Sequence, residues 1–460
     1  MTKSGKISRR DIPSIEALAS EPEVVSFCEK IPRQLAVEII RNAVEEFKRR
    51  LNENEEGLSL PELKSRIIEE LNITVRKKVG RVINGTGVLV HTNLGRAPLA
   101  ETLFDRIKSH IVGYGNLEFD INSGKRGRRG ELAEKYLALA SEAEDAVIVN
   151  NNAAAIFLII NTLACKKKVV ISRGELVQIG GGFRIPEIIR RAEGKLLEIG
   201  TTNITTIDDY RAALTNNPAM ILRVHKSNFA QKGFTEEATL KELAKLGAES
   251  GVPVINDLGS GVFIDTSEFI GIEEPTVQSS SRDGASLTCF SGDKLLGGVQ
   301  AGLIVGRRDL TDRLKKNPVY RALRVDKIVF SALEELLKFY LDGVWQAEIK
   351  LWSLAAVKEK ELYEKGQRLL QEIAGGEKII LEGSKGEMGG GSLPTVVLPS
   401  VALVFRSQLS PQKLAQLFRA AEPPVIGRIG DGRFMIDLKA IDDCDLKALT
   451  RIIKTLLPQL

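Results

Sequence analysis

From residue 82 onward, short apolar runs alternate with segments of helical periodicity, and this alternation limits the possible folds most strongly. The apolar runs that predict strands are residues 146–150, 168–172, 196–199, 219–224, 253–256 and 285–290. A strand in a parallel sheet is buried on both faces, so it reads as a continuous apolar run, and the intervening helices cover those faces. The sequence therefore predicts an α/β fold with a mostly parallel sheet flanked by helices.

The regions before and after this alternation have a different texture. Apolar residues at helical spacing predict N-terminal helices at residues 13–19, 32–51 and 58–71. A helix-rich stretch, residues 327–374, follows the last strand candidate. Glycine-rich residues 383–391 predict a loop between strands. Further strands near residues 401–405 and 433–438 complete a smaller α/β unit.

These textures predict four segments. They are a small all-helical N-terminal domain, a linker with an active-site arm, a core domain and a small α/β C-terminal domain. Their predicted bounds are residues 1–75, 76–105, 106–330 and 331–460.

Composition indicates a large soluble enzyme. The chain has 460 residues, of which 43% are hydrophobic and 27% charged, enough for two or three domains and a sizeable core. No stretch approaches the roughly 18 apolar residues of a membrane span, and the N-terminus lacks the apolar segment of a secretory signal, so we expect a cytoplasmic protein. Four scattered cysteines and three histidines suggest no disulfide framework and no metal site. A net charge of +5 is modest for this length and does not by itself indicate a nucleic-acid partner, and no DNA partner is expected.

One lysine stands in a setting that suits covalent chemistry. Lys294 lies in residues 291–298 (SGDKLLGG), a polar loop between an apolar run and a glycine pair. Partial burial lowers the pKa of an amine and makes it a nucleophile toward an aldehyde. As a loop residue, Lys294 is nevertheless expected to bury little area. An isolated lysine of this kind more often only caps a turn, so its companions decide the interpretation.

Two other features accompany this lysine. Asp257 falls at the C-terminal end of an apolar run, the end at which open α/β sheets bind ligands. Residues 150–155 (NNNAAA) form a turn in which small residues open a helix, so that backbone N–H groups can bind an anion. Alone, such a turn is more often an ordinary helix N-cap.

These parts, in this order, are typical of fold-type I pyridoxal phosphate enzymes. In that class an aspartate pairs with the protonated pyridine nitrogen, and the lysine holds the cofactor aldehyde as an internal aldimine. We therefore predict that Lys294 and Asp257 are catalytic. The residues predicted to bind pyridoxal 5'-phosphate are Lys294, Asp257, Asn152, Ala153, Ala154 and Ser291.

A series of motifs runs along essentially the whole chain. They are residues 83–87 (INGTG), 91–99 (HTNLGRAPL), 116–120 (NLEFD), 124–127 (GKRG), 172–177 (SRGELV), 200–203 (GTTN), 257–261 (DLGSG), 291–298 and 321–324 (RALR). Together they resemble bacterial selenocysteine synthase, the L-seryl-tRNA(Sec) selenium transferase family. The chain departs from that pattern at Ile204, where an arginine is expected, and at Val299, where a proline is common.

The resemblance implies a pyridoxal phosphate-dependent transferase that converts seryl-tRNA(Sec) to selenocysteinyl-tRNA(Sec). The serine hydroxyl is eliminated, and selenium from selenophosphate adds to the aminoacrylyl intermediate. The family's selenium donor or its phosphate is held by arginines that match Arg96, Arg321 and Arg324. Arginine suits an oxyanion because its fork donates two parallel hydrogen bonds. Without the resemblance, each of them is more often a surface or ion-pair arginine. On a helix, Arg321 and Arg324 would share a face.

The resemblance also implies partners. It assigns tRNA binding to residues 1–75, and shape and phosphate contacts suit a region whose first 80 residues carry 15 Lys/Arg against 14 Asp/Glu. It implies a homo-oligomer, in which dimers form a ring-shaped decamer. Two alternatives stay open. A related lyase could act on a small amino acid or amino sugar acid without tRNA, although such relatives tend to lack the helical domain. A tRNA-binding protein could have a decayed cofactor site, against which Lys294 and Asp257 argue.

Overall fold

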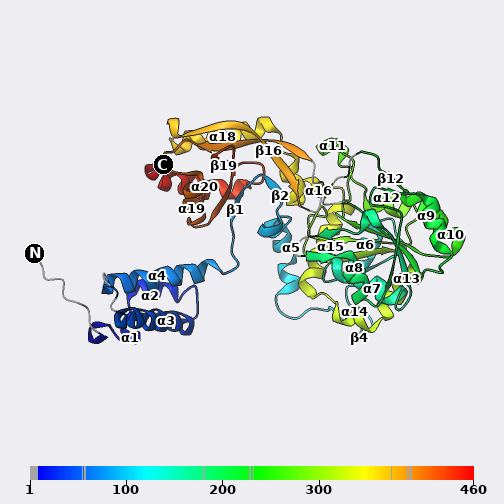
Figure 1. Ribbon diagram of the computed structural model, residues 1–460, viewed down its shortest axis with the longest axis horizontal. Helices are drawn as coiled ribbons and strands as arrows, with labels where there is room; N and C mark the ends of the chain where they lie inside the picture. The colour runs from blue at the N-terminus through cyan, green and yellow to red at the C-terminus, as the bar shows by residue number, and fades with distance from the viewer. Residues whose placement is uncertain are drawn as a thin grey trace, which may run out of the picture. The chain divides into compact units, whose positions relative to one another are not determined.

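The structure is a computed structural model. It describes residues 9–53, 55, 58–179, 182–226, 229, 231, 233–374, 376–390, 393 and 396–460. The chain divides into two compact units, Met1–Arg81 and Val82–Leu460 (Figure 1), and each is described by itself. The four predicted segments are a finer division and remain a prediction.

The first unit is a helical bundle. Its helices are α1 (Ile15–Ala19), α2 (Pro22–Phe27), α3 (Arg33–Asn52) and α4 (Leu60–Arg76), preceded by a short 3-10 turn, Arg9–Asp11. The apolar stripe predicted from the sequence forms its core, in which Ile40 and Phe47 of α3 pack with Ile67 of α4. Ser59 caps α4, because its hydroxyl accepts a hydrogen bond from Glu62 N at 3.2 Å. The N-terminal region is therefore all-helical, as predicted.

A seven-stranded sheet forms the centre of the second unit. Its strands in spatial order are β5 (Asp145–Val149), β15 (Gly302–Gly306), β14 (Leu287–Ser291), β13 (Val254–Gly259), β11 (Met220–Val224), β6 (Lys168–Ser172) and β9 (Lys195–Ile199). All neighbouring pairs are parallel except the two that β15 makes with β14 and β5. The mostly parallel sheet and its six predicted strands are confirmed, whereas β15 was not predicted.

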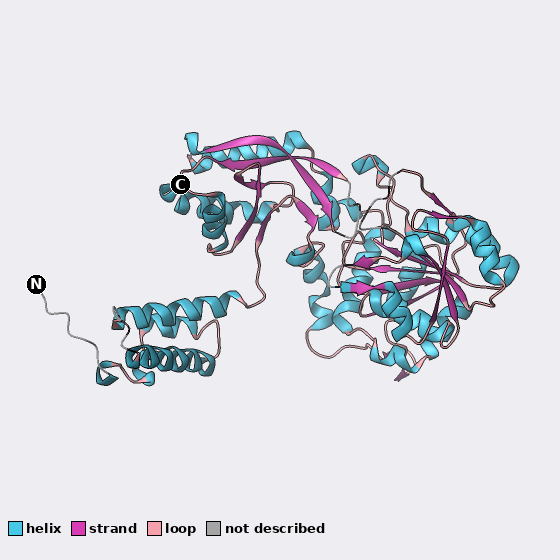
Figure 2. Ribbon diagram, in the orientation of Figure 1, coloured by secondary structure: helices cyan, strands magenta, loops and turns pink. Residues whose placement is uncertain are grey.

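Helices cover both faces of this sheet, which Figure 2 shows as a central layer of strands among helices. On one face, Val147 and Val149 pack with helices α7 (Asn152–Leu163), α8 (Ile185–Arg191) and α13 (Arg308–Lys316). On the other, Ala146 and Ile148 pack with α5 (Glu101–Ile111), α6 (Glu131–Ala140) and α15 (Lys327–Leu341). Successive residues of β5 thus face opposite layers, as the pleat of a strand requires.

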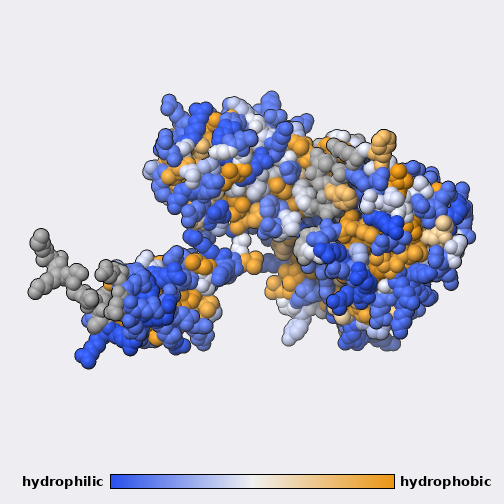
Figure 3. All heavy atoms as spheres, viewed as in Figure 1, coloured by the Kyte–Doolittle hydropathy of each residue, from blue (hydrophilic) through white to orange (hydrophobic). Residues whose placement is uncertain are grey.

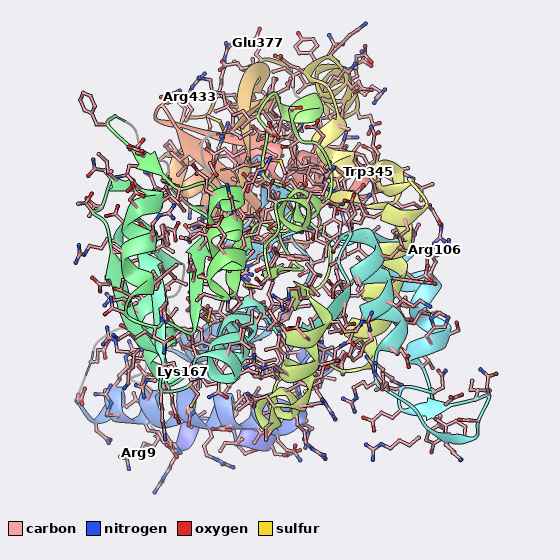
Figure 4. All side chains as sticks on the ribbon, turned by 90° about the vertical axis from the view of Figure 1, so that its right-hand side faces the viewer. Arg9, Arg106, Lys167, Trp345, Glu377 and Arg433 are labelled. Carbon is pink, nitrogen blue, oxygen red and sulfur yellow. The ribbon has the colours of Figure 1, made fainter. Side chains whose placement is uncertain are left out.

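Helices α5 and α15 lie side by side on the second of these faces. The guanidinium carbon of Arg106 in α5 lies 5.0 Å from the centre of the Phe339 ring in α15, and Figure 4 shows Arg106 beside that helix. Helices α9 (Ile207–Leu214) and α10 (Leu240–Ser250) pack against the interior strands β6, β11 and β13 through Val170, Ile221 and Val254.

A second sheet, of six strands, belongs to the C-terminal part. Its order is β1 (Ile83–Gly85), β18 (Val425–Gly430), β19 (Arg433–Asp437), β17 (Val397–Phe405), β16 (Ile379–Gly389) and β2 (Val88–Val90). The helices α18 (Glu359–Ile373), α19 (Pro411–Arg419) and α20 (Asp443–Leu456) pack against it. The strands β1 and β2 come from the predicted arm, so the start of the second unit is built into the C-terminal sheet.

The prediction of a loop at residues 383–391 is wrong. Residues 383–389 belong to β16, which pairs antiparallel with β17, while Gly391 lies outside the described residues. The glycines are there for close backbone approach rather than for a turn. A Cβ at Gly386 would lie 3.0 Å from Gly87 O, and one at Gly389 would lie 2.3 Å from Val90 O.

The remaining elements are short. They are β3 (Phe119–Asp120), β4 (Lys125–Arg126), β7 (Gln178–Ile179), β8 (Phe183–Arg184), β10 (Ile204–Thr205), β12 (Glu236–Glu237), α11 (Ser267–Ile270), α12 (Val277–Arg282), α14 (Pro318–Ala322), α16 (Trp345–Glu348) and α17 (Lys350–Ala356). Hydrophilic side chains cover much of the face shown in Figure 3, with apolar patches among them. In the described part of the chain, no helix is long and apolar enough to cross a membrane.

Candidate active site

Lys294 lies in the turn that follows β14, at the carboxyl edge of the central sheet. The turn is held by backbone bonds: Leu295 N donates to Ser260 O at 3.0 Å, and Gly298 N donates to Gly292 O at 2.9 Å. Only 6% of Lys294 is exposed, so the expectation that it buries little area is wrong. The turn packs so closely against its surroundings that only glycine fits at two positions. A Cβ at Gly292 would lie 2.6 Å from Val299 O, and one at Gly298 would lie 2.4 Å from the Leu336 side chain.

This burial changes the acid–base properties of the amine. Burial lowers the pKa of Lys294, while the negative charge of Asp257 acts in the opposite direction and the positive charge of Arg96 adds to the lowering. An amine with a lowered pKa is more often neutral, and only the neutral amine is a nucleophile. The site is therefore suited to a covalent bond between the Lys294 nitrogen and a carbonyl carbon.

Asp257 lies in β13, level with Val224 of β11 and Cys289 of β14. It is 4% exposed, and its Oδ1 accepts a hydrogen bond from Asn152 Nδ2 at 2.8 Å. Burial raises the pKa of Asp257, and the bond from Asn152 and the charge of Lys294 act against that rise. Because Asn152 occupies Oδ1, the arrangement favours Oδ2 for a ligand that carries a proton.

The turn between β5 and α7 supplies the candidate anion site. Asn151 caps α7, since its side chain accepts from Ala154 N at 2.9 Å. The N–H of Ala154 is therefore already bound, whereas Asn152 and Ala153 lie in the first turn, where helix N–H groups have no intrahelical partner. Gly302 makes room for this turn, because a Cβ there would lie 2.0 Å from Asn151 O.

The six predicted cofactor residues thus have different surroundings. Asn152 contacts Asp257 through its side chain, Asn152 and Ala153 can each offer a backbone N–H, and Ser291 is the buried last residue of β14. The buried atoms Asn152 Oδ1 and Ser260 Oγ have no hydrogen-bond partner among the described residues. A buried amine, a buried carboxylate, a helix N-terminus and two orphaned polar atoms together fit a ligand with an aldehyde, a ring nitrogen and a phosphate.

Arg96 joins this site from the arm. It adopts a left-handed conformation with φ of 67°, and its Nη1 donates to both carboxylate oxygens of Asp293 at 2.9 Å. In addition, Ala97 N donates to Asp293 O at 3.1 Å. Arg96 is thereby bound to the residue next to Lys294.

The other two predicted arginines are arranged differently from the expectation. Helix α14 ends at Ala322, so Arg324 lies beyond it and the shared helix face does not occur. The backbone between them binds the anion turn, because Asn150 N donates to Leu323 O at 3.1 Å. Arg321 is exposed. Within the described ranges, no carboxylate forms an ion pair with either guanidinium, so both can accept an anionic ligand.

Sequence reasoning missed some residues around Asp257. His225 follows β11 directly, and its N donates to Asp257 O at 2.8 Å. Its Nε2 lies 3.2 Å from Oε1 of the buried Glu274. The position of His225 at the end of a predicted strand was the available signal, since the same rule identified Asp257. Cys289, with Sγ 3.9 Å from Asp257 Oδ1, had no signal beyond its place in an apolar run.

Known proteins resemble the chain along nearly its whole length. The family described as L-seryl-tRNA selenium transferase matches residues 82–442, and that described as selenocysteine synthase N terminal matches residues 9–46. The L-seryl-tRNA(Sec) selenium transferase of Aquifex aeolicus is 41% identical over 97% of this chain and 98% of its own length. That of Geotalea daltonii is 39% identical over 98% and 99% of the two chains.

Among solved structures, D-glucosaminate-6-phosphate ammonia-lyase has a similar fold. Its TM-score is 0.59 at 18% sequence identity, and the similarity covers 83% of this chain and 96% of that one. At this identity the likeness concerns the fold alone. Together with the sheets described above, it confirms the predicted fold class.

Proposed function

The chain belongs to the L-seryl-tRNA selenium transferase family, and from this membership we propose that it converts seryl-tRNA(Sec) to selenocysteinyl-tRNA(Sec) with selenophosphate as selenium donor. The observation that carries the proposal is about 40% identity to such transferases over nearly the full length of both chains. The family predicted from the sequence motifs is confirmed. The selenium donor and the roles of individual residues are proposals.

The cofactor proposed for this site is pyridoxal 5'-phosphate. Lys294 would hold its aldehyde, Asp257 its ring nitrogen, and the first turn of α7 at Asn152 and Ala153 its phosphate. The chemistry that this cofactor supplies when bound is electron withdrawal from the α-carbon of an attached amino acid. That withdrawal is what a seryl group needs in order to lose its α-proton and its β-hydroxyl.

The protein's own contribution is to place charges and protons. Asn152 fixes one oxygen of Asp257, so that the carboxylate can keep a proton on the nitrogen that faces it. The buried Lys294 amine releases a proton more readily than an exposed lysine does, because burial lowers its pKa. Burial of both groups also excludes water, which strengthens each electrostatic contact in the site.

A single-turnover assay tests this function. Purified protein reconstituted with pyridoxal phosphate is given seryl-tRNA(Sec) and selenophosphate, and in a parallel reaction free serine and selenophosphate. We expect selenocysteinyl-tRNA(Sec) in the first reaction and no selenocysteine in the second. Equal or faster reaction of free serine would favour the alternative, a lyase-type relative that acts on small amino acids.

We propose that residues 1–81 bind the tRNA. Support comes from their own hydrophobic core, which makes them a separate unit, and from exposed basic side chains on α3 and α4, such as Arg41 and Arg76. Arg50, by contrast, is paired with Glu55 and Glu62. Exposed lysines and arginines of this kind can contact phosphates.

Deletion of residues 1–81 should abolish binding of seryl-tRNA(Sec) and leave the cofactor absorption spectrum unchanged, because the residues proposed to bind pyridoxal phosphate belong to the second unit. Binding by the full chain should also weaken steeply with added salt, since phosphate contacts release counterions. Filter binding at several salt concentrations measures the loss of tRNA binding on truncation and the salt dependence of tRNA binding by the full chain. A truncated protein that binds the tRNA as tightly as the full chain would move the tRNA site to the second unit.

The three arginines are proposed to hold the selenium donor. Replacement of Arg321 and Arg324 together by alanine should leave tRNA affinity unchanged and reduce selenium transfer at least about 100-fold, because two charge-assisted contacts are lost. Arg211→Ala, an exposed arginine on α9, is the matched control. A normal dependence of rate on selenophosphate in the double variant would remove both residues from the donor site.

A homo-oligomer is also proposed, at least a dimer and, from the family resemblance, a ring-shaped decamer. Support comes from large apolar side chains that are exposed in one segment: Val112, Tyr114, Phe119 and Ile121. Such groups on a chain of this size are typical of a contact surface. A cytoplasmic location is proposed because the substrate is an aminoacyl-tRNA.

A further inference from the structure

The backbone around Arg324 is held on both sides. Before it, Leu323 O accepts from Asn150 N at 3.1 Å. After it, Val325 O accepts from Arg129 Nη1 at 3.3 Å, and Asp326 begins α15 by accepting from Ile328 N at 3.0 Å and Val329 N at 3.1 Å. The main chain at Arg324 is therefore fixed next to the anion turn, and the direction of its guanidinium depends on what the side chain contacts.

The contact is the ring of Tyr320. The Arg324 guanidinium carbon lies 5.6 Å from the ring centre, within the range of a cation–π interaction. Tyr320 belongs to α14 and is only 9% exposed, so its ring is held in place by its neighbours and the arginine side chain packs against it. Neither Arg321 nor Arg324 has a carboxylate partner in the described part of the chain, so contact with this ring is the main interaction that orients the Arg324 guanidinium.

The ring is in turn anchored to a buried charge cluster. The Tyr320 hydroxyl lies 3.4 Å from Glu134 Oε1, and Glu134 is 3% exposed. Glu134 is paired with Lys315 at 3.0 Å and with Arg128 at 3.0 Å, and Lys315 also binds Asp145 at 2.7 Å. Apart from Arg128, which lies in the loop before α6, these residues come from α6, α13, α14 and β5, so the cluster fixes Tyr320 relative to the strand that leads into the anion turn.

The phenol of Tyr320 is neutral at physiological pH, as that of an ordinary tyrosine is, and its surroundings strengthen this preference. Burial, followed by the negative charge of Glu134, raises the pKa of Tyr320 well above its ordinary value. The ring therefore stays a neutral, electron-rich face at physiological pH, as an attractive contact with a guanidinium requires.

We propose that Tyr320 is a positioning residue that directs Arg324 toward the anionic selenium donor. This inference rests on the proposed function, because it takes the donor site at Arg324 as given. The competing explanation is that Tyr320 only fills space in the core. The two explanations differ in one respect: only a positioning role depends on the electrons of the ring rather than on its shape.

The experiment replaces Tyr320 by phenylalanine and by a series of fluorinated phenylalanines, which keep the shape of the ring but weaken its electron-rich face step by step. Tyr320→Phe is expected to leave the KM for selenophosphate within about twofold. Across the series that KM should rise progressively, to about tenfold at full fluorination, since cation–π contacts have about this strength. The KM for seryl-tRNA(Sec) should stay constant.

Two controls make the outcome specific. In an Arg324→Ala background the fluorinated series should have no effect on the selenophosphate KM. The exposed Tyr363, treated in the same way, should also have none. The proposal is overturned by a flat series in the presence of Arg324, or by an equal rise in its absence. If the wild-type protein shows no selenophosphate-dependent conversion at all, the proposed function fails, and that result differs from a flat series in an active enzyme.

Discussion

Replacement of Lys294 by alanine is expected to reduce selenocysteinyl-tRNA(Sec) formation by about four orders of magnitude or more, because the variant has no amine to bind the cofactor aldehyde. Single-turnover conversion measures this loss. In the wild-type protein, borohydride reduction followed by peptide mapping should place the pyridoxyl group on Lys294. A labelled peptide from any other position would remove Lys294 from its proposed role.

The variant should nevertheless fold. Burial lowers the pKa of Lys294 in the folded state, so the unfolded chain binds the proton more strongly. Below the pH at which an ordinary lysine titrates, this buried amine therefore costs stability, and its removal relieves that cost. We expect a melting temperature within a few degrees of wild type, offset only by the small cavity left behind. Lys241→Ala, an exposed lysine on α10, serves as the control and should retain full activity.

Replacement of Asp257 by asparagine should reduce turnover by about two to three orders of magnitude while cofactor binding to Lys294 persists. The amide has nearly the shape of the carboxylate but no charge with which to keep a proton on the ring nitrogen. The measurement is single-turnover rate together with the absorption spectrum. Near-normal activity would mean that another residue faces the ring nitrogen.

Stability gives an independent readout for Asp257. Burial raises its pKa in the folded state, so the charged carboxylate costs stability at pH values above its ordinary range, and asparagine removes that cost. The variant should then be no less stable than wild type at neutral pH, and the difference should shrink in acid. Asp265→Asn, an exposed carboxylate that accepts from Ser267 N at 2.8 Å, is the matched control for charge removal alone.

Much of the fold could be predicted because its signals are local. A strand buried on both faces needs a continuous run of buried residues, and residues 254–256 and 287–290 form such runs. The strand β15 was missed because its five residues lie just after the glycine-rich turn. Its antiparallel pairing with β14 and β5 depends on the order of strands in the sheet, which no local pattern specifies. Strand β16 was taken for a loop because glycine is read first as a turn residue, whereas its glycines here admit the arm strands.

The candidate site divides in the same way. The sequence by itself determined the presence of an amine after one strand and a carboxylate at the end of another, because both are properties of a few consecutive residues. Only the tertiary structure decided what they touch. Asn152 reaches Asp257 across 105 residues of chain, and Arg96 reaches Asp293 across 197, so neither contact leaves a local pattern. The burial of Lys294 and the direction of Arg324 depend likewise on elements packed from elsewhere, since the free energy of a side chain is set by its surroundings and a sequence motif specifies only its neighbours in the chain.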